Sequence, residues 1–473
     1  MTTDKAGIVE TLVSRLGDSG VLRDDDALSR YTHDWAGDAL GTPLAVVRPR
    51  TTDEVADIVR LCNEHDLRMV PQGGHTGLVG GAFPDRDQDE LIISLERMNR
   101  IRDLDPVNFS MTVDAGCILE EVKQAADTED CDFPLSLGAQ GSCQIGGNIA
   151  TNAGGLNVLR YGMMRELVLG LEVVLPNGEI WDGLSALHKD NRGYDLAQLF
   201  LGSEGTLGIV TGAVLKLVPK AEQTRTALLG LPSVAAVIEL YTLARRGCSD
   251  LLSAFELIPR RCIELAMEAS PQLSDPLDEA YPWYVLMEVA ATGPIDLSEM
   301  LERLLENGME KDLVLDGALA SSDAQSQNLW QFRESMLEGQ RLKGKHLRTD
   351  VSVPISAIPD FVDRAAVMVS DVSPDSTVIA YGHIGDGNLH FNILPPPDTS
   401  NEERRVLLHD LEQRLFAILD EFRGSISAEH GIGRTKQAAY LARLSPTERE
   451  LMQGIKSLFD PKGVMSRGRI LPE

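Results

Sequence analysis

Residues 71–81 read PQGGHTGLVGG, and five of these eleven residues are glycine. The strand-like residues 67–70 (LRMV) come directly before this run, and a short apolar run lies at 44–48. Between these two stretches lies a helical pattern, whose apolar face comprises Val55, Ile58, Val59 and Cys62. The order strand, helix, strand and glycine turn predicts an α/β unit.

Two more glycine-rich tracts follow, GAQGSCQIGGNIATNAGG at residues 138–155 and LGSEGTLGIVTG at residues 201–212. Glycine lets backbone N–H groups converge on an anion, as they do at phosphate sites. No tract matches GxGxxG or GxxxxGK[ST], which disfavours an ordinary NAD or ATP site. Three such tracts within the first 220 residues therefore predict one domain that binds a large cofactor containing a pyrophosphate.

Composition excludes several classes of function. The 473 residues carry a formal net charge of −28, and such an acidic surface repels nucleic acid and anionic lipid. The uncharged residues 133–159 are rich in Gly, Asn, Ser and Gln and would make a poor membrane span. The six cysteines form no CxxC pair, which indicates reduced thiols. We therefore expect a cytoplasmic enzyme with no nucleic acid partner and no membrane span.

The composition and the hydrophobic pattern of the chain change after Pro219. Glycine becomes rarer, and helical patterns such as 234–246 alternate with strand-like runs such as 284–290 and 389–394. This alternation predicts a second α/β domain on an antiparallel or mixed sheet.

A metal-like pattern lies in this second half, at residues 381–390, YGHIGDGNLH. Two extended arms around the Gly-Asp-Gly-Asn turn would bring His383 and His390 together. Downstream, SAEHGIG at residues 427–433 adds Glu429 and His430. Two histidines and one glutamate with open positions are a common ligand set for catalytic zinc and for non-haem iron. A metallohydrolase and histidines that merely satisfy core hydrogen bonds are the alternatives.

Six motifs occur in this order along the chain: PQGGHTGLVGG, LGAQGSCQIGGNIATNAGG, RYG, GYDLAQLFLGSEGTLGIVTG, GHIGDGNLHFN and SAEHGIG. Together they resemble the FAD-dependent D-2-hydroxyacid dehydrogenases of the vanillyl-alcohol-oxidase flavoprotein superfamily. The resemblance implies an α+β or α/β fold, with a two-subdomain, PCMH-type FAD-binding domain and a substrate domain made of an antiparallel sheet covered by helices. The implied boundaries are 1–220 for the FAD domain (subdomains about 1–100 and 101–220), 221–422 for the substrate domain and 423–473 for a C-terminal return to the flavin.

The resemblance also implies the residues of the site. For FAD it implies Pro71, Gly73, Gly74, His75, Thr76, Gly77, Leu78, Gly80, Gly138, Ser142, Gly146, Gly147, Asn148, Thr151, Ala153, Glu204, Gly208 and Ile209. For a divalent metal, Zn²⁺ first, it implies His383, His390 and Glu429, and for the catalytic base His430. For the substrate it implies Arg333, Arg348 and Asn392. We expect noncovalent FAD, with a histidyl link at His75 as the alternative.

The implied reaction is oxidation of a D-2-hydroxy acid to the 2-oxo acid by hydride transfer to the flavin. D-2-hydroxyglutarate is the first candidate substrate. Leu337 replaces a threonine that contacts the distal carboxylate in some members, so D-lactate, glycolate and other 2-hydroxy acids stay open. No cysteine cluster for an iron–sulfur centre is visible, so electrons must pass to a separate acceptor such as an electron-transfer flavoprotein or a quinone. The oligomeric state is left open, with a homodimer as the candidate.

Overall fold

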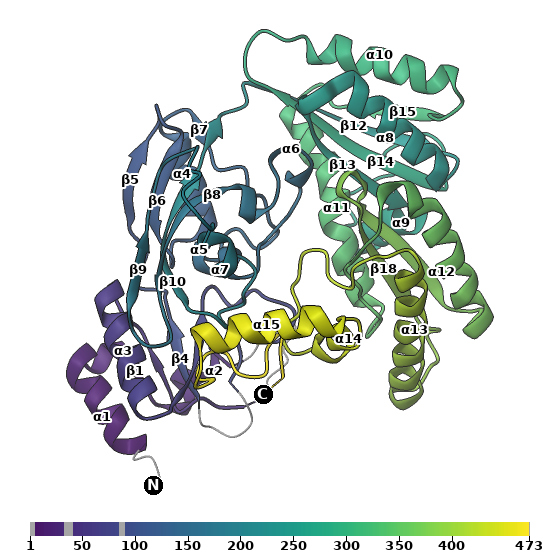
Figure 1. Cartoon of the computed structure of the whole chain (residues 1–473). Helices are drawn as coiled ribbons and strands as arrows, with labels where there is room; N and C mark the ends of the chain where they lie inside the picture. The colour runs from purple at the N-terminus through teal and green to yellow at the C-terminus, as the bar shows by residue number, and fades with distance from the viewer. Residues whose placement is uncertain (1–4, 33–40, 85–89, 473) are drawn as a thin grey trace. The chain divides into compact units, whose positions relative to one another are not determined.

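Figure 1 shows the computed structural model, which describes residues 5–32, 41–84 and 90–472. The chain forms two compact units. Unit 1 comprises Met1–Gly155, Gly162–Lys220 and Glu429–Glu473, and unit 2 comprises Leu156–Tyr161 and Ala221–Ala428. The short segment 156–161 therefore belongs to unit 2, although residues on both sides of it belong to unit 1. The chain enters unit 2 again at Ala221, and unit 1 resumes at Glu429.

The first sheet of unit 1 contains the predicted α/β unit. Helix α3 (Thr52–Glu64) connects β2 (Ala45–Val47) to β3 (Arg68–Gln72), and both strands pair in parallel with β4 (Glu90–Ser94). Thr51 caps α3 because its side chain accepts a hydrogen bond from the N–H of Glu54. Strand β1 (Val21–Leu22) pairs with β2 in antiparallel fashion, and α1 (Lys5–Leu16) and α2 (Asp25–Ser29) precede this unit. The first glycine tract begins at the carboxyl end of β3, the edge where α/β sheets bind ligands.

The second sheet of unit 1 is antiparallel, in the order β5-β6-β10-β8-β9. Its strands are β5 (Ile101–Asp105), β6 (Ser110–Asp114), β10 (Ile209–Lys216), β8 (Val168–Val174) and β9 (Ile180–Gly183). A short pair, β7 (Cys131–Asp132) and β11 (Val218–Pro219), lies outside it. The associated helices are α4 (Leu119–Asp127), α5 (Ile145–Ala150) and α7 (Ala197–Phe200), and the last segment of unit 1 adds α14 (Gln437–Leu441) and α15 (Pro446–Phe459).

Unit 2 is built on one antiparallel sheet in the order β15-β12-β14-β13-β17-β18-β16, which confirms the antiparallel sheet predicted for the second half of the chain. The strands are β12 (Gln223–Leu231), β13 (Leu252–Pro259), β14 (Trp283–Ala291), β15 (Asp316–Leu319), β16 (Val351–Ser352), β17 (Thr377–His383) and β18 (Asn388–Leu394). The helices are α6 (Val158–Tyr161), α8 (Val234–Cys248), α9 (Arg260–Ala269), α10 (Leu297–Glu310), α11 (Asp323–Leu342), α12 (Ile358–Val372) and α13 (Asn401–Glu421).

One face of this sheet packs against α9 and α11. Apolar residues of both helices, such as Cys262 and Phe332, share a buried cluster with Ile258 of β13 and Tyr381 of β17. Side chains alternate between the two faces of a strand, so Glu256, two residues before Ile258, lies on this same face. On β18, whose His390 is opposite Tyr381 in the register, that face carries the polar side chains.

Candidate functional site

The first two glycine tracts meet backbone to backbone within unit 1. A Cβ atom added to Gly74 would lie 2.0 Å from the carbonyl oxygen of Ser142, and one added to Gly73 would lie 3.4 Å from the amide nitrogen of Gly147. Glycine is therefore required at residue 74 by close packing. A Cβ at Gly77 would meet nothing within 4 Å, so part of the tract borders open space. These features fit a backbone cradle for an anionic cofactor.

His75 lies in this cradle with a left-handed backbone (φ 58°), which is uncommon for a residue that is not glycine. Its ring contacts that of Phe83 edge to face, at 5.2 Å between centroids. In the second tract, Asn148 and Thr151 lie on and directly after α5, and the Thr151 hydroxyl donates to the carbonyl of Gly147. Both predicted cofactor segments are therefore ordered by local contacts.

Glu204 in the third tract connects this region to the last segment of the chain. Its carboxylate accepts hydrogen bonds of 2.7 Å from the N–H groups of both Ile432 and Gly433. Burial raises the pKa of Glu204, although these two N–H groups oppose the shift. A Cβ at Gly81, at the end of the first tract, would lie 3.5 Å from the same carboxylate. Glu204 thus holds the turn that follows His430, a contact that the sequence did not reveal.

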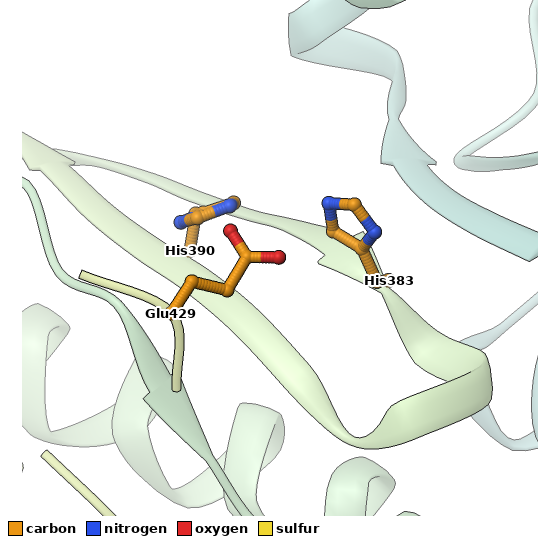
Figure 2. A group of neighbouring side chains, drawn as sticks. All are labelled: His383, His390 and Glu429. Carbon is orange, nitrogen blue, oxygen red and sulfur yellow. The ribbon is translucent and has the colours of Figure 1, made fainter. Parts of the chain in front are cut away.

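The predicted metal ligands His383, His390 and Glu429 come together. One ligand atom from each lies within 4.8 Å of the others, and Figure 2 shows the Glu429 carboxylate directed toward the two imidazole rings. Glu429 directly follows Ala428, the last residue of unit 2. The N–H of Ala428 donates to the carbonyl of Asp350 at 3.2 Å, so this end of the loop is anchored in unit 2.

Local sequence explains why the two histidines converge. The turn between β17 and β18 is closed by Gly387 in the left-handed region (φ 86°), where a Cβ would lie 2.5 Å from the carbonyl oxygen of Val353. The register then pairs Tyr381 with His390, and His383 ends β17. Two imidazole nitrogens and one carboxylate oxygen at this spacing fit a divalent metal such as zinc or iron.

His430, the predicted base, lies beside this group. Asp350, Glu429 and His430 form a second set whose ligand atoms lie within 4.8 Å of one another. The Ser427 hydroxyl donates to the Asp350 carboxylate at 3.3 Å. The sequence pattern did not identify Asp350 as a site residue, although Asp350 lies two residues after Arg348, a predicted substrate ligand.

The predicted substrate residues have different surroundings. Arg333 on α11 donates from Nε to the carboxylate of Glu256 at 2.7 Å, and its guanidinium lies 5.1 Å from the centre of the Tyr381 ring. Asn392 is buried, and its amide bonds to the N–H of Thr349 and to the side chain of Gln340. Arg348 is exposed. Tertiary structure thus brings Arg333 to the histidine region, whereas the Asn392 amide is engaged by neighbouring protein groups.

Glu256 is a site residue that sequence reasoning missed. Its carboxylate is buried, with Oε1 3.2 Å from Nδ1 of His383 and Oε2 2.7 Å from Nε of Arg333. Burial by itself would raise the pKa of Glu256, but the neighbouring His383 and Arg333 outweigh burial and hold the pKa below its ordinary value. The available signal was a single acidic residue inside the otherwise uncharged strand LSAFELIP.

Comparisons with known proteins identify the class. The family described as "FAD linked oxidases, C-terminal domain" matches residues 220–470, and "FAD binding domain" matches residues 43–183. Among solved structures, p-cresol methylhydroxylase has a TM-score of 0.77 at 18% identity, covering 100% of this chain and 98% of that chain. An alkyldihydroxyacetonephosphate synthase has a TM-score of 0.76 at 16% identity, covering 99% and 84%. The chain belongs to the FAD-linked oxidase family and is an FAD-linked oxidoreductase with the predicted fold.

Curated relatives refine this placement within the family. A "Probable D-2-hydroxyglutarate dehydrogenase, mitochondrial" from Oryza sativa subsp. indica is 41% identical over 97% of this chain and 81% of its own length. The Bos taurus "D-2-hydroxyglutarate dehydrogenase, mitochondrial" is 40% identical over 96% and 81%. A "D-2-hydroxyglutarate dehydrogenase" from Xanthomonas citri pv. viticola is 40% identical over 94% and 92%. The predicted resemblance to FAD-dependent D-2-hydroxyacid dehydrogenases is confirmed.

The predicted cytoplasmic location is wrong: it is contradicted by the rice and cattle relatives, which are named as mitochondrial. The prediction rested on reduced cysteines, and all six are indeed free and buried. A buried thiol reports a reducing or protected environment and does not distinguish one such compartment from another. Separately, no helix in the described part of the chain is long and apolar enough to cross a membrane.

Proposed function

We propose that this enzyme oxidises a D-2-hydroxy acid to the 2-oxo acid with assistance from a divalent metal, and that D-2-hydroxyglutarate is its substrate. The observation that carries the proposal is the convergence of His383, His390 and Glu429 in a chain whose relatives bear the D-2-hydroxyglutarate dehydrogenase name. A metallohydrolase would use a similar ligand set, but it would not require the FAD-binding domain at residues 43–183.

Each residue has a defined task in this proposal. A divalent cation, zinc by preference, supplies positive charge that makes the substrate hydroxyl more acidic. His430 accepts the hydroxyl proton at a ring nitrogen. FAD, held without a covalent bond, supplies the hydride acceptor. His383, His390 and Glu429 are the residues that would hold the cation, and Arg333 and Arg348 supply positive charge for the substrate carboxylates.

The remaining assignments complete the proposal. Residues 1–220 and 423–473 serve FAD, and residues 221–422 serve the substrate. The three glycine tracts would hold FAD, and Gly73, Gly74 and Gly77 would hold its pyrophosphate. Asn392 serves the substrate side by holding Thr349 in place, as its hydrogen bond to the Thr349 N–H supports. Electrons leave to a separate acceptor, such as an electron-transfer flavoprotein or a quinone.

One structural feature argues against D-2-hydroxyglutarate as the substrate. Leu337 lies on α11 one turn after Arg333, and it cannot donate a hydrogen bond to a second carboxylate. A monocarboxylate such as D-lactate or glycolate is therefore the competing substrate, and the experiment must compare the two classes.

The test is anaerobic reduction of the purified enzyme by D-2-hydroxyglutarate, D-lactate and glycolate in separate reactions. The loss of visible flavin absorption measures the reduction. L-2-hydroxyglutarate is the matched control. We expect D-2-hydroxyglutarate to reduce the flavin fastest, and a chelator that strips divalent metal to slow reduction without releasing FAD. A flavin that stays oxidised with every 2-hydroxy acid contradicts the proposal.

A further inference from the structure

The Glu256 carboxylate is buried in unit 2, where a charged group is energetically unfavourable. It lies in the middle of β13, where all eight residues are buried, and its own exposure is 0%. A buried carboxylate costs free energy unless charges and hydrogen bonds compensate it, and an apolar residue of similar volume is often at least as stabilising. Stability by itself therefore gives little reason for a glutamate at this position.

The surroundings of the carboxylate suggest what it does. Its two oxygens lie near two different side chains, a predicted metal ligand and a predicted substrate ligand: Oε1 is 3.2 Å from Nδ1 of His383, and Oε2 is 2.7 Å from Nε of Arg333. The register of β13 and β17 explains the first contact, because Glu256 is directly opposite His383. Helix α11, which packs on the same face of the sheet, supplies Arg333.

We propose that Glu256 is a positioning residue that orients the His383 ring for metal binding and at the same time aligns Arg333. This inference deepens the proposed function and rests on its metal group. A carboxylate near Nδ1 favours the tautomer with the proton on Nδ1, which leaves the Nε2 lone pair as the metal ligand. Figure 2 shows one ring nitrogen of His383 turned toward Glu429 and the other turned away.

The same carboxylate connects the proposed metal site to Arg333, the proposed substrate ligand. Arg333 is held between Glu256 and the face of the Tyr381 ring, and its side chain is only 11% exposed. Tyr381 is opposite His390 in the register, and the two rings lie 5.0 Å apart. One support therefore serves a proposed metal ligand and a proposed substrate ligand.

Glu256→Gln is the informative variant because it keeps the shape and removes the second acceptor oxygen. If the amide oxygen accepts from Arg333, the amide nitrogen faces His383 and favours a proton on Nε2, which blocks the metal ligand atom. The alternative orientation places an amide N–H against the Nε–H of Arg333. Either orientation disturbs one of the two aligned groups.

Glu288→Gln is the matched control. Glu288 lies on the neighbouring strand β14, opposite Ala254 in the register, and its carboxylate is also largely buried on this face. Its partners are neutral donors: the Trp330 indole at 3.1 Å and the hydroxyls of Ser253 and Thr226. The same chemical change is thus made two residues away in register, without contact to a proposed metal ligand.

The experiment measures zinc affinity of the FAD-loaded full-length enzyme after metal removal, by competition with a chromogenic zinc chelator. We expect Glu256→Gln to bind zinc about 10–100-fold more weakly, the usual loss for an outer partner of a metal-binding histidine. Glu288→Gln should bind zinc like the wild type, and both variants should retain FAD. Unchanged zinc affinity in Glu256→Gln overturns the inference while leaving the proposed function intact, whereas a wild type that binds no zinc overturns the metal part of both.

A second measurement requires no folded variant at position 256. The ¹⁵N NMR spectrum of histidine-labelled, metal-free wild type reports the tautomer of each imidazole, and His383→Gln identifies the His383 signals by their loss. The inference requires a His383 proton on Nδ1. A neutral His383 with its proton on Nε2 overturns it, whatever the fate of Glu256→Gln.

Discussion

Arg469, three residues before the last described residue, forms a fully buried ion pair with Glu90, at 3.3 Å between Nη1 and Oε1. The same guanidinium donates to the carbonyl oxygens of Gly81, the last residue of the first glycine tract, and of Phe83, two residues later. The last segment of the chain is thereby fastened to the region proposed to hold FAD. Buried charges of this kind are costly when one partner is removed.

Arg469→Met should therefore destabilise unit 1 by about 3–5 kcal/mol, because it leaves the Glu90 carboxylate buried without its nearest cation. Chemical denaturation monitored by flavin fluorescence measures the change. Arg405→Gln is the control, since Arg405 pairs with Glu402 on the exposed surface of α13 and should have little effect. Equal stability of Arg469→Met and wild type would contradict this role for the ion pair.

Gly74→Ala should impair FAD retention. The added Cβ would lie 2.0 Å from the carbonyl oxygen of Ser142, so the two glycine tracts must separate. The ratio of FAD to protein after purification, together with the melting temperature, measures the effect. Gly454→Ala on α15 is the control, because its Cβ meets nothing within 4 Å and alanine is about 0.5–1 kcal/mol better than glycine in a helix. Full FAD occupancy in Gly74→Ala would argue against a tight contact between the tracts.

Glu288 should make the stability of unit 2 depend on pH. Burial raises the pKa of Glu288 above its ordinary 4.5, and the neutral donors Trp330, Ser253 and Thr226 only partly oppose the shift. A raised pKa in the folded state means that folding favours the protonated acid, so this contribution is complete below about 4.5 and is lost as pH rises through the folded-state value. Melting temperatures across this range should fall more with rising pH in wild type than in Glu288→Gln. Parallel curves for the two proteins would exclude Glu288 as the source.

Loss of a proposed metal ligand should have a larger effect than loss of its outer partner. We expect His390→Asn and Glu429→Gln to lower zinc affinity by at least about 100-fold, the upper end of the range for outer partners. Metal content by elemental analysis and the flavin spectrum are measured together, because FAD should stay bound. Activity of Glu429→Gln equal to that of wild type would contradict a metal-assisted reaction.

Arg333→Gln should raise the KM for the hydroxy acid by roughly 10–100-fold, which corresponds to the loss of one charge-assisted hydrogen bond of about 1.5–3 kcal/mol. Steady-state kinetics with an artificial electron acceptor measures KM and kcat separately. Arg341→Gln is the control, because Arg341 lies on the same helix and pairs with Glu338 at the surface. A KM that does not change would remove Arg333 from the substrate site.

Local pattern was sufficient for much of this protein. The spacing of Val55, Ile58, Val59 and Cys62 predicted α3 between two strands, and all four residues are buried in the structure. The glycine tracts predicted a cofactor cradle, and the YGHIGDGNLH motif predicted two converging histidines. These features depend on residues close in sequence, where helix and strand periods and turn chemistry decide the conformation.

Contacts between distant residues required the tertiary structure. Glu256 meets Arg333 and His383, Glu204 meets Ile432, and Glu90 meets Arg469. The partners that form hydrogen bonds are 77 to 379 positions apart in the sequence. A strand period tells which face a side chain occupies, but only strand order and register decide what lies opposite. The sequence by itself therefore determined the class of cofactor domain and the candidate ligands, whereas the folded sheet determined which buried charges lie against those candidate ligands.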